Sequence, residues 1–306
     1  LFRLPHTVHS TAVSCRALTG PININHDYSD SMAERDSGFI QIYEENNQEA
    51  YDNYLQAHRI AETEDVRLPV MICEDGFITS HAIENIELEE DEAVKAFVGE
   101  YHPENYLLKE ENPLAVGPYG VSGYYMEARV AQAEAMKNAK RAIKEVAADF
   151  EAKFGRHYDF FEAYQMQDAE MAIVLMGSSS GTAKAAVDEL RSQGVKAGLI
   201  KIRVFRPFPG EELAEALKHC KVVAVLDKSE GFSANGGPLF AETASAMINL
   251  EQRPKMVDIV YGLGGRDFTI DHAKRVFARL QKILDTGEVG PIYSHMGQRD
   301  LREEVQ

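Results

Sequence analysis

The sequence predicts an α/β protein in which a partial parallel-sheet unit is followed by a second, doubly wound unit. Three observations indicate this class: strand and helix patterns alternate over residues 1–81, four apolar strands with interleaved helices fill 168–285, and a long amphipathic helix over 127–154 lies between them. Strands that alternate with helices point to a parallel sheet. With 306 residues, the chain is long enough for roughly two domains.

The first unit, residues 1–81, is predicted to contain three strands and one helix. The run FIQIYEE alternates apolar and polar residues as a half-buried strand does, whereas LPVMICEDG is a near-continuous apolar run typical of a strand buried on both faces. A helix is expected to begin after Asn46 or Asn47, either of which can be its N-cap, with Glu49 in the first turn. The strand candidates lie at 9–17, 39–45 and 68–76.

Residues 82–167 are predicted to be an acidic linker and a long bridging helix. The linker starts with ENIELEEDEAVKAF and continues in a stretch rich in Pro, Gly, Tyr and Asn, so it is either a strap that wraps along a surface or a solvated acidic loop. The helix over 127–154 has apolar residues at three- and four-residue steps and ends at Gly155. It would span roughly 40 Å, which is long enough to bridge two domains.

The second unit, residues 168–285, has strand and helix patterns that turn residues separate cleanly. This order is that of a small, complete doubly wound domain. Residues 286–306 are expected to form a C-terminal tail. The predicted strands are EMAIVLMG, KAGLIKIRVF, KVVAVLD and MVDIVYGLGG, and the predicted helices are SSGTAKAAVDELRSQG, RPFPGEELAEALKHC, LFAETASAMINL and TIDHAKRVFARLQKIL.

The composition argues against several function classes. The formal net charge of −17 disfavours nucleic acid and anionic membrane surfaces as partners, and it suits a partner with a basic contact face. The three cysteines form no CxxC pair, so neither a disulfide framework nor a cysteine-held zinc or iron–sulfur site is expected. Because no apolar run approaches a membrane span and the first residues lack a signal-peptide pattern, we expect a cytoplasmic location. The chain begins almost inside an apolar run, as though partway through a domain.

Glycine-rich motifs follow predicted strands, where open α/β sheets bind ligands. GSSSGT at 177–182 can be an anion site at a helix N-terminus or a serine N-cap with a tight turn, and the lack of a P-loop lysine favours the turn. SANGGP at 233–238 favours structural or interface roles over catalysis, whereas Arg266 and Asp267 of GLGGRD at 262–267 could be functional or could simply pair with each other. His6 and His9 lie outside any helical pattern and have no adjoining carboxylate cluster, so no metal site is expected.

The segment RALTGPININHDYSDSMAERDSG, residues 16–38, has no clear helical or strand period. Long segments of this kind are usually lids, binding loops or disorder. Arg16 ends an apolar strand candidate, so its guanidinium is expected at the carboxyl edge of the sheet, where it could grip a substrate carboxylate. It could equally pair with Asp27 or Asp30 and hold the segment together, and the residues alone leave both readings open.

This segment and several others strongly resemble the alpha subunit of pyruvate:ferredoxin oxidoreductase (pyruvate synthase), in the 2-oxoacid:ferredoxin oxidoreductase family. The resemblance runs in order through nearly the whole chain. The N-terminal part of the family pattern, which carries the Glu that activates the cofactor and a Thr near the substrate, does not occur in this sequence. Matching stretches beyond 16–38 include QIY at 41–43, DGF at 75–77, FRPFP at 205–209, GGPL at 236–239 and GLGGRD at 262–267.

The resemblance implies a partial transketolase-like pyrimidine-binding domain followed by a transketolase C-terminal-like domain. It implies a thiamine diphosphate enzyme of anaerobic metabolism that decarboxylates pyruvate oxidatively, forms acetyl-CoA and reduces ferredoxin, or runs in reverse. The cofactor and its Mg²⁺ are expected to be shared with a beta subunit. The [4Fe–4S] clusters are expected on partner subunits, with gamma- and delta-type ferredoxin-like chains, in a dimer of hetero-oligomers.

The resemblance also implies the site residues. Arg16 matches an arginine that helps to hold the substrate carboxylate in this family. Two alternatives stay open: the same reaction on another 2-oxoacid such as 2-oxoisovalerate, or a non-catalytic scaffold or dimerisation subunit of such a complex. The residues expected to line the active site from the loop are Asn23, Asp27, Asp30, Arg35 and Asp36.

Overall fold

The structure is a computed structural model that describes residues 7–11, 25–115, 117, 119–233 and 235–299. Strands alternate with helices along the chain and form two sheets, which confirms the predicted α/β class. Arg16 and Asn23 lie outside the described residues, as does most of the strand candidate at 9–17.

The first sheet has the strand order β1-β3-β2-β7. β1 (Thr7–Thr11) and β2 (Ile40–Tyr43) flank β3 (Val70–Glu74), and all three strands run parallel. The strands predicted at 39–45 and 68–76 are thereby confirmed.

The half-buried character predicted for β2 is wrong, because all four of its residues are buried. Ile40 and Ile42 face the helix-covered core of the first unit. The opposite face is covered by the segment around α1 (Ser29–Ala33), where Gln41 Nε2 donates to the Ser31 carbonyl over 2.7 Å. The alternation of apolar and polar residues therefore reflects an apolar core on one face of β2 and a hydrogen-bonded segment on the other, and neither face meets solvent.

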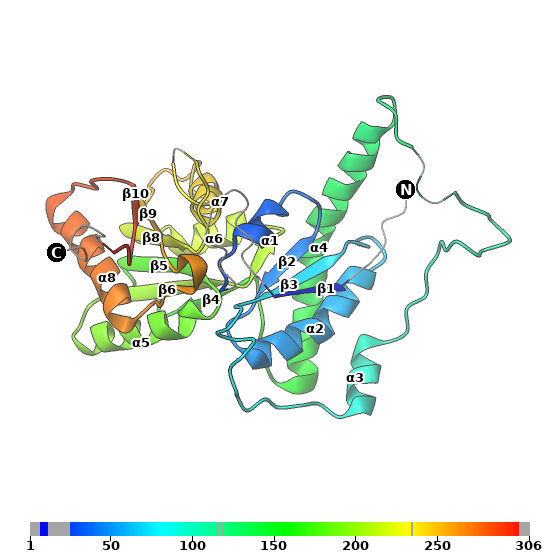
Figure 1. Ribbon diagram of the computed structural model, residues 1–306, viewed down its shortest axis with the longest axis horizontal. Coiled ribbons are helices and arrows are strands. Elements are labelled where there is room, and N and C mark those ends of the chain that lie inside the picture. Colours follow the sequence, from blue (N-terminus) through cyan, green and yellow to red (C-terminus); the bar gives the residue numbers. More distant parts are fainter. Residues whose placement is uncertain (1–6, 12–24, 116, 118, 234, 300–306) are drawn as a thin grey trace.

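Two long helices pack against the first sheet. α2 (Asn47–Glu62) begins as predicted, with the Asn46 side chain accepting a hydrogen bond from the Glu49 backbone over 2.9 Å. α4 (Tyr125–Phe154) confirms the long helix, and it ends at Gly155, which adopts a left-handed conformation. The buried residues of α4 join the core of the first sheet, and its N-terminal turns project beyond the body (Figure 1).

The second sheet has the strand order β10-β9-β8-β5-β6-β4. Its strands run parallel except β4, which is an antiparallel edge. The parallel central strands are almost entirely buried, as expected of a sheet with helices on both faces. The strands are β4 (Phe161–Tyr164), β5 (Met171–Met176), β6 (Ala197–Ile202), β8 (Val222–Asp227), β9 (Lys255–Val260) and β10 (Tyr293–His295).

Helices cover both faces of this sheet, as the doubly wound prediction requires. Residues of α5 (Ser179–Ser192) and α8 (Ile270–Thr286) share one core cluster with the strands. Residues of α6 (Gly210–Leu217) and α7 (Pro238–Ala246) share the cluster on the other face.

One predicted strand, KAGLIKIRVF, is wrong as a single element. It divides at Arg203 into β6 of the second sheet and β7 (Val204–Arg206), which pairs antiparallel with β2 of the first sheet. The Arg203 carbonyl accepts a hydrogen bond from the Tyr43 backbone over 2.7 Å, so the chain changes sheets at this residue. Apolar character does not indicate which sheet a strand will join.

Segments assigned to the linker and to the tail also supply strands. β4 follows α4 within 82–167, and β10 lies within 286–306, yet both form edges of the second sheet. Across the described part of the chain, no helix is both long and apolar enough to cross a membrane.

Candidate functional site

A buried polar cluster lies at the carboxyl ends of strands from both sheets. Asp75 directly follows β3, Ser178 lies just beyond β5, and Lys228 directly follows β8. His26 and Tyr28 enter from the segment before α1. The carboxyl ends of parallel strands are where open α/β sheets place their ligand sites, so this edge is the candidate functional region.

Asp75 is the centre of the cluster. Lys228 Nζ lies 2.9 Å from Asp75 Oδ2, and His26 Nε2 lies 2.9 Å from Oδ1. Tyr28 donates its hydroxyl hydrogen to Oδ1 over 2.8 Å, while the Ser178 backbone N–H donates to Oδ2 over 3.1 Å and the Ser178 hydroxyl donates to the same oxygen. Asp75, Lys228, His26 and Tyr28 are each at most 2% exposed.

The environment of Asp75 favours its ionised form. Burial raises the pKa of the carboxyl, but the Lys228 ammonium, His26 and the Ser178 hydrogen bond outweigh burial and hold the pKa well below its usual range. Burial, followed by the Asp75 charge, raises the pKa of Tyr28 well above its usual range, so the phenol remains a donor. The cluster is therefore a buried ion pair with hydrogen-bond donors around the carboxylate.

Backbone contacts fix the His26-Asp27-Tyr28 segment between the two sheets. The Tyr28 N–H donates to the Lys228 carbonyl over 2.8 Å, and the Gly265 N–H donates to the His26 carbonyl over 2.9 Å. Asp27 is 1% exposed and accepts a hydrogen bond from the Gly264 N–H over 3.1 Å. The segment is thus held by the strand end after β8 and by the turn after β9.

The glycine motifs provide the space for this segment. Gly177 has a φ of +75°, and a Cβ there would lie 1.8 Å from the Tyr28 hydroxyl oxygen. Gly265 has a φ of +76°, and a Cβ there would lie 2.5 Å from the Asn25 Cβ. Only glycine combines this backbone conformation with such close approach. Ser178 occupies the N-cap position of α5, but its hydroxyl donates to Asp75 instead of capping the helix.

The structure separates the predicted loop residues into two groups. Asp27 belongs to the His26-Asp27-Tyr28 segment described above. Asp30 nearby accepts a hydrogen bond from the Ser31 N–H over 2.7 Å, and burial raises the Asp30 pKa. Arg35 and Asp36 lie elsewhere, at a cavity of about 290 Å³ beside α4 that Arg129 and Arg206 also line. The roles assigned to these four residues, and to Arg16 and Asn23, stay predictions.

Glu44 is a buried acid that the sequence analysis missed. It follows β2, and its backbone N–H donates to the Cys73 carbonyl, so it lies at the same strand edge as Glu74 and Asp75. Among the residues that the structure describes, neither of its buried carboxyl oxygens meets a hydrogen-bond partner. Burial, followed by the Glu74 charge, raises the Glu44 pKa well above its usual range, which favours the neutral form of the carboxyl.

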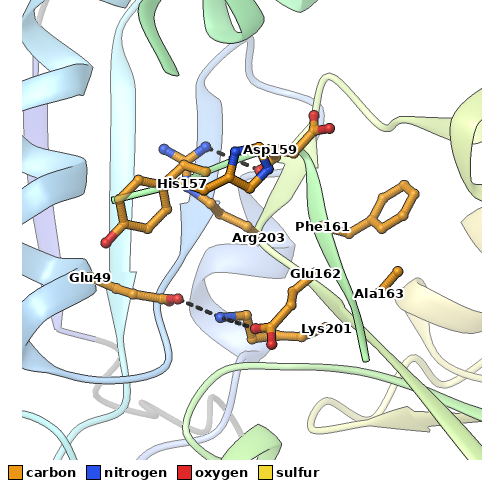
Figure 2. A pocket seen from close by; sticks show the side chains of 9 residues that line it. Glu49, His157, Asp159, Phe161, Glu162, Ala163, Lys201 and Arg203 are labelled. Carbon is orange, nitrogen blue, oxygen red and sulfur yellow. Dashed lines mark hydrogen bonds and ion pairs between the residues drawn. The ribbon is translucent and has the colours of Figure 1, made fainter. Parts of the chain in front are cut away.

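A second cavity, of about 400 Å³, lies between α2, β4 and β6 (Figure 2). The Lys201 ammonium lies between the carboxylates of Glu49 and Glu162, and it also pairs with Glu45 over 2.8 Å. Burial lowers the Lys201 pKa, but Glu49 and Glu45 outweigh burial and hold it above its usual value. Because acids of the first unit satisfy a lysine of the second sheet, this network joins the two units.

His26, Tyr28, Asp75, Lys228 and Glu44 escaped identification as site residues, although most of them stand beside recognisable patterns. Asp75 and Lys228 directly follow apolar strands, where open α/β sheets place their ligand sites, and this position could have identified both residues from the sequence. Among the residues that the structure describes, no group of three or more His, Cys, Asp or Glu side chains is placed to hold a metal ion.

Family models match most of the chain. One described as "Pyruvate flavodoxin/ferredoxin oxidoreductase, thiamine diP-bdg" matches residues 3–148, and one described as "Pyruvate:ferredoxin oxidoreductase core domain II" matches residues 169–273. The first match covers most of the unit built on the first sheet, and the second covers most of the unit built on the second sheet.

Curated relatives match over nearly the full chain. The pyruvate synthase subunit PorA of Thermotoga maritima is 50% identical over 90% of this chain and 69% of its own length. PorA of Methanocaldococcus jannaschii is 45% identical over 89% of this chain and 70% of its own length. The ketoisovalerate oxidoreductase subunit VorA of Pyrococcus horikoshii is 42% identical over 90% of this chain and 69% of its own length.

A solved structure shows the same fold. The 2-oxoglutarate:ferredoxin oxidoreductase of Magnetococcus marinus superposes with a TM-score of 0.57 and 15% identity, over 91% of this chain and 48% of that one. This chain therefore spans about half of that structure, and the likeness concerns the fold. The identities to curated subunits decide the relationship: the chain belongs to the pyruvate:ferredoxin oxidoreductase family of 2-oxoacid:ferredoxin oxidoreductases.

Proposed function

We propose that this chain is the alpha subunit of a cytoplasmic complex that converts pyruvate and CoA to acetyl-CoA and CO₂ while reducing ferredoxin, or that runs this reaction towards pyruvate. The observation that carries the proposal is its 41–50% identity to six pyruvate synthase PorA subunits. Identities of 41–42% to two VorA subunits support the second candidate, the same reaction on 2-oxoisovalerate. Pyruvate is preferred because the highest of these identities is to PorA.

The proposed cofactor is thiamine diphosphate with Mg²⁺, shared with a beta subunit. When bound, it supplies the carbon nucleophile that activates the 2-oxoacid carbonyl. The carboxyl edge of the first sheet fits a polar group supplied from outside the described residues, because the buried oxygens of Glu44 have no partner there. We assign to Glu44 a neutral carboxyl that faces this group. The [4Fe–4S] clusters are assigned to the beta, gamma and delta-type partners.

In this proposal, the contribution of the chain is positioning and electrostatics. Arg16 neutralises and orients the substrate carboxylate through its planar guanidinium. The Asp75 cluster anchors the segment that leads back to Arg16, because it fixes His26 and Tyr28 between the two sheets. Asp27 and Asp30 support this segment, whereas the cavity position of Arg35 and Asp36 favours a contact role for that pair.

The test is turnover of the reconstituted complex with Arg16 substituted. Arg16→Lys keeps the charge and removes the planar fork, so kcat/KM for pyruvate is expected to fall about 10- to 100-fold, the range for a lost charge-assisted hydrogen bond. Arg141→Lys is the matched control, because Arg141 makes exposed ion pairs on α4. Undiminished pyruvate turnover in Arg16→Lys would refute the assignment and favour the scaffold reading. A higher kcat/KM for 2-oxoisovalerate than for pyruvate in the wild-type complex would favour the second candidate.

A further inference from the structure

The segment between α3 (Asp91–Val98) and α4 is an extended strap that leaves the body of the molecule. In Figure 1 it runs out from α3, away from both sheets, and returns to the projecting end of α4. We use "strap" for residues 99–115, 117 and 119–124. Apart from short turns, its described residues form no helix and no strand.

The strap is held at its beginning. Phe97, at the end of α3, is buried against the rings of Phe150 and Phe154, with centroids 5.3 and 5.5 Å apart. Farther along, Glu104 pairs with Arg67 of the first unit over 3.3 Å. The strap therefore leaves the body from a defined position, which limits the entropy that a partner must remove on binding.

Beyond Glu104 the strap exposes large apolar side chains. Leu108 is 83% exposed and Tyr119 is 92% exposed. For the described residues from 105 to 124, the hydrogen bonds stay within the strap or reach the first turn of α4. So many exposed apolar side chains on one segment mark an interaction site. The exposed apolar residues of this region are Tyr106, Leu107, Leu108, Tyr119, Val121, Tyr124, Tyr125, Met126 and Val130.

The charge of this region indicates whether the strap binds a second copy of this chain or a different subunit. Residues 99–124 contain four acidic residues and one lysine, a net charge of −3, and residues 82–98 just before them contain six acidic residues and one lysine, a net charge of −5. A second copy would bring the same acidic strap to the contact, whereas complementary interfaces bring opposite charges together. The matching partner is a surface with an apolar groove flanked by Lys and Arg.

We propose that the strap is a docking arm for a different subunit of the complex, which receives its apolar side chains in a groove with a basic rim. This inference rests on the proposed multi-subunit function and adds the surface through which one partner is held. An extended segment suits the role because it presents side chains on both sides and leaves its backbone groups available to the partner.

The first test substitutes three exposed apolar residues, as Tyr106→Ser, Leu107→Ser and Leu108→Ser in one chain. The full-length variant is titrated against the purified partner subunits, and assembly is followed by native mass spectrometry. Affinity is expected to fall about 30-fold, the effect of losing one interface hot spot. Ile248→Ser, at an exposed apolar position near the end of α7, is the matched control and should assemble like wild type.

The melting temperature of the isolated triple variant separates docking from folding. It should match wild type, because exposed substitutions change stability little. Wild-type affinity in the triple variant would overturn the proposal. The proposal would also be overturned if the wild-type chain alone formed a homodimer and the triple variant did not. In that case the strap would bind a second copy of this chain. Pyruvate turnover of the wild-type complex is recorded separately, so an assembled but inactive complex counts against the proposed function and leaves the docking result to stand.

Charge reversal tests the basic rim. Glu110→Lys with Glu111→Lys should weaken assembly several-fold at low ionic strength, and the deficit should shrink as salt is raised, because exposed charges are screened within about 10 Å at 0.1 M salt. Equal affinities of the variant and wild type at low salt would overturn the assignment of a basic partner.

Discussion

Asp75→Asn tests the claim that a buried ion pair holds the two sheets and the segment before α1 together. The substitution preserves the shape of the side chain and removes its charge. Lys228, which is 2% exposed, then keeps a buried ammonium without its carboxylate partner, and Tyr28 loses its anionic acceptor. The effect is therefore larger than the loss of one hydrogen bond.

Removing one partner of a buried pair costs about 3–5 kcal/mol, because the remaining charge is left uncompensated. At about 2–4 °C per kcal/mol, the melting temperature of the full chain should fall by roughly 6–20 °C, measured by calorimetry at pH 7. Asp36→Asn is the control, because that side chain is 76% exposed and its removal should change the melting temperature little. Asp75→Asn combined with Lys228→Met should be less destabilised than the two single effects summed.

The pH dependence gives this prediction a second readout. The folded-state pKa of Asp75 is depressed, so its contribution is present above the unfolded pKa of about 4 and is lost as the pH falls below that value. The difference in the free energy of unfolding between wild type and Asp75→Asn should therefore become smaller below pH 4. A loss below 1 kcal/mol at pH 7, or a gap that stays constant down to pH 3, would refute the reasoning.

Two further predictions concern single residues. Because the folded-state pKa of Glu44 is raised, wild type loses stability as the pH rises above about 4.3, so Glu44→Gln should gain stability relative to wild type by up to about 1.4 kcal/mol per pH unit. A stability difference between Glu44→Gln and wild type that stays constant in thermal melts from pH 5 to 8 would contradict this. Asn46→Ala should lose about 1 kcal/mol in urea unfolding because it removes the α2 cap, whereas Asn47→Ala, one residue later, should not; equal losses would contradict the capping assignment.

Local patterns predicted those elements whose signals lie within one stretch of chain. The Asn46 cap, the buried strand β3 and the end of α4 at Gly155 each depend on residues a few positions apart. The crossing of the chain at Arg203 depends on distant partners: the Tyr43 backbone of the first sheet and the Asn53 side chain, which accepts from Arg203 Nε over 2.8 Å. No periodicity within KAGLIKIRVF encodes that choice.

The candidate site shows the same limit. Asp75 and Lys228 are 153 positions apart, and neither looks unusual beside its own strand. The sequence analysis treated 16–38 as one segment that lines the active site. In the structure the chain turns through α1, which leaves Asp27 buried beside Gly264 and Arg35 at a separate cavity. A contiguous motif was thus divided by tertiary structure between two surroundings.

The Asp75 cluster also ties the segment before α1 to both sheets. His26 and Tyr28 contact Asp75 of the first sheet, while the same segment bonds to the Lys228 carbonyl and to Gly265 of the second sheet. A shift of one sheet relative to the other must therefore move this segment or break one of these contacts. The lysine network around Lys201, which joins the same two units from another side, limits that shift.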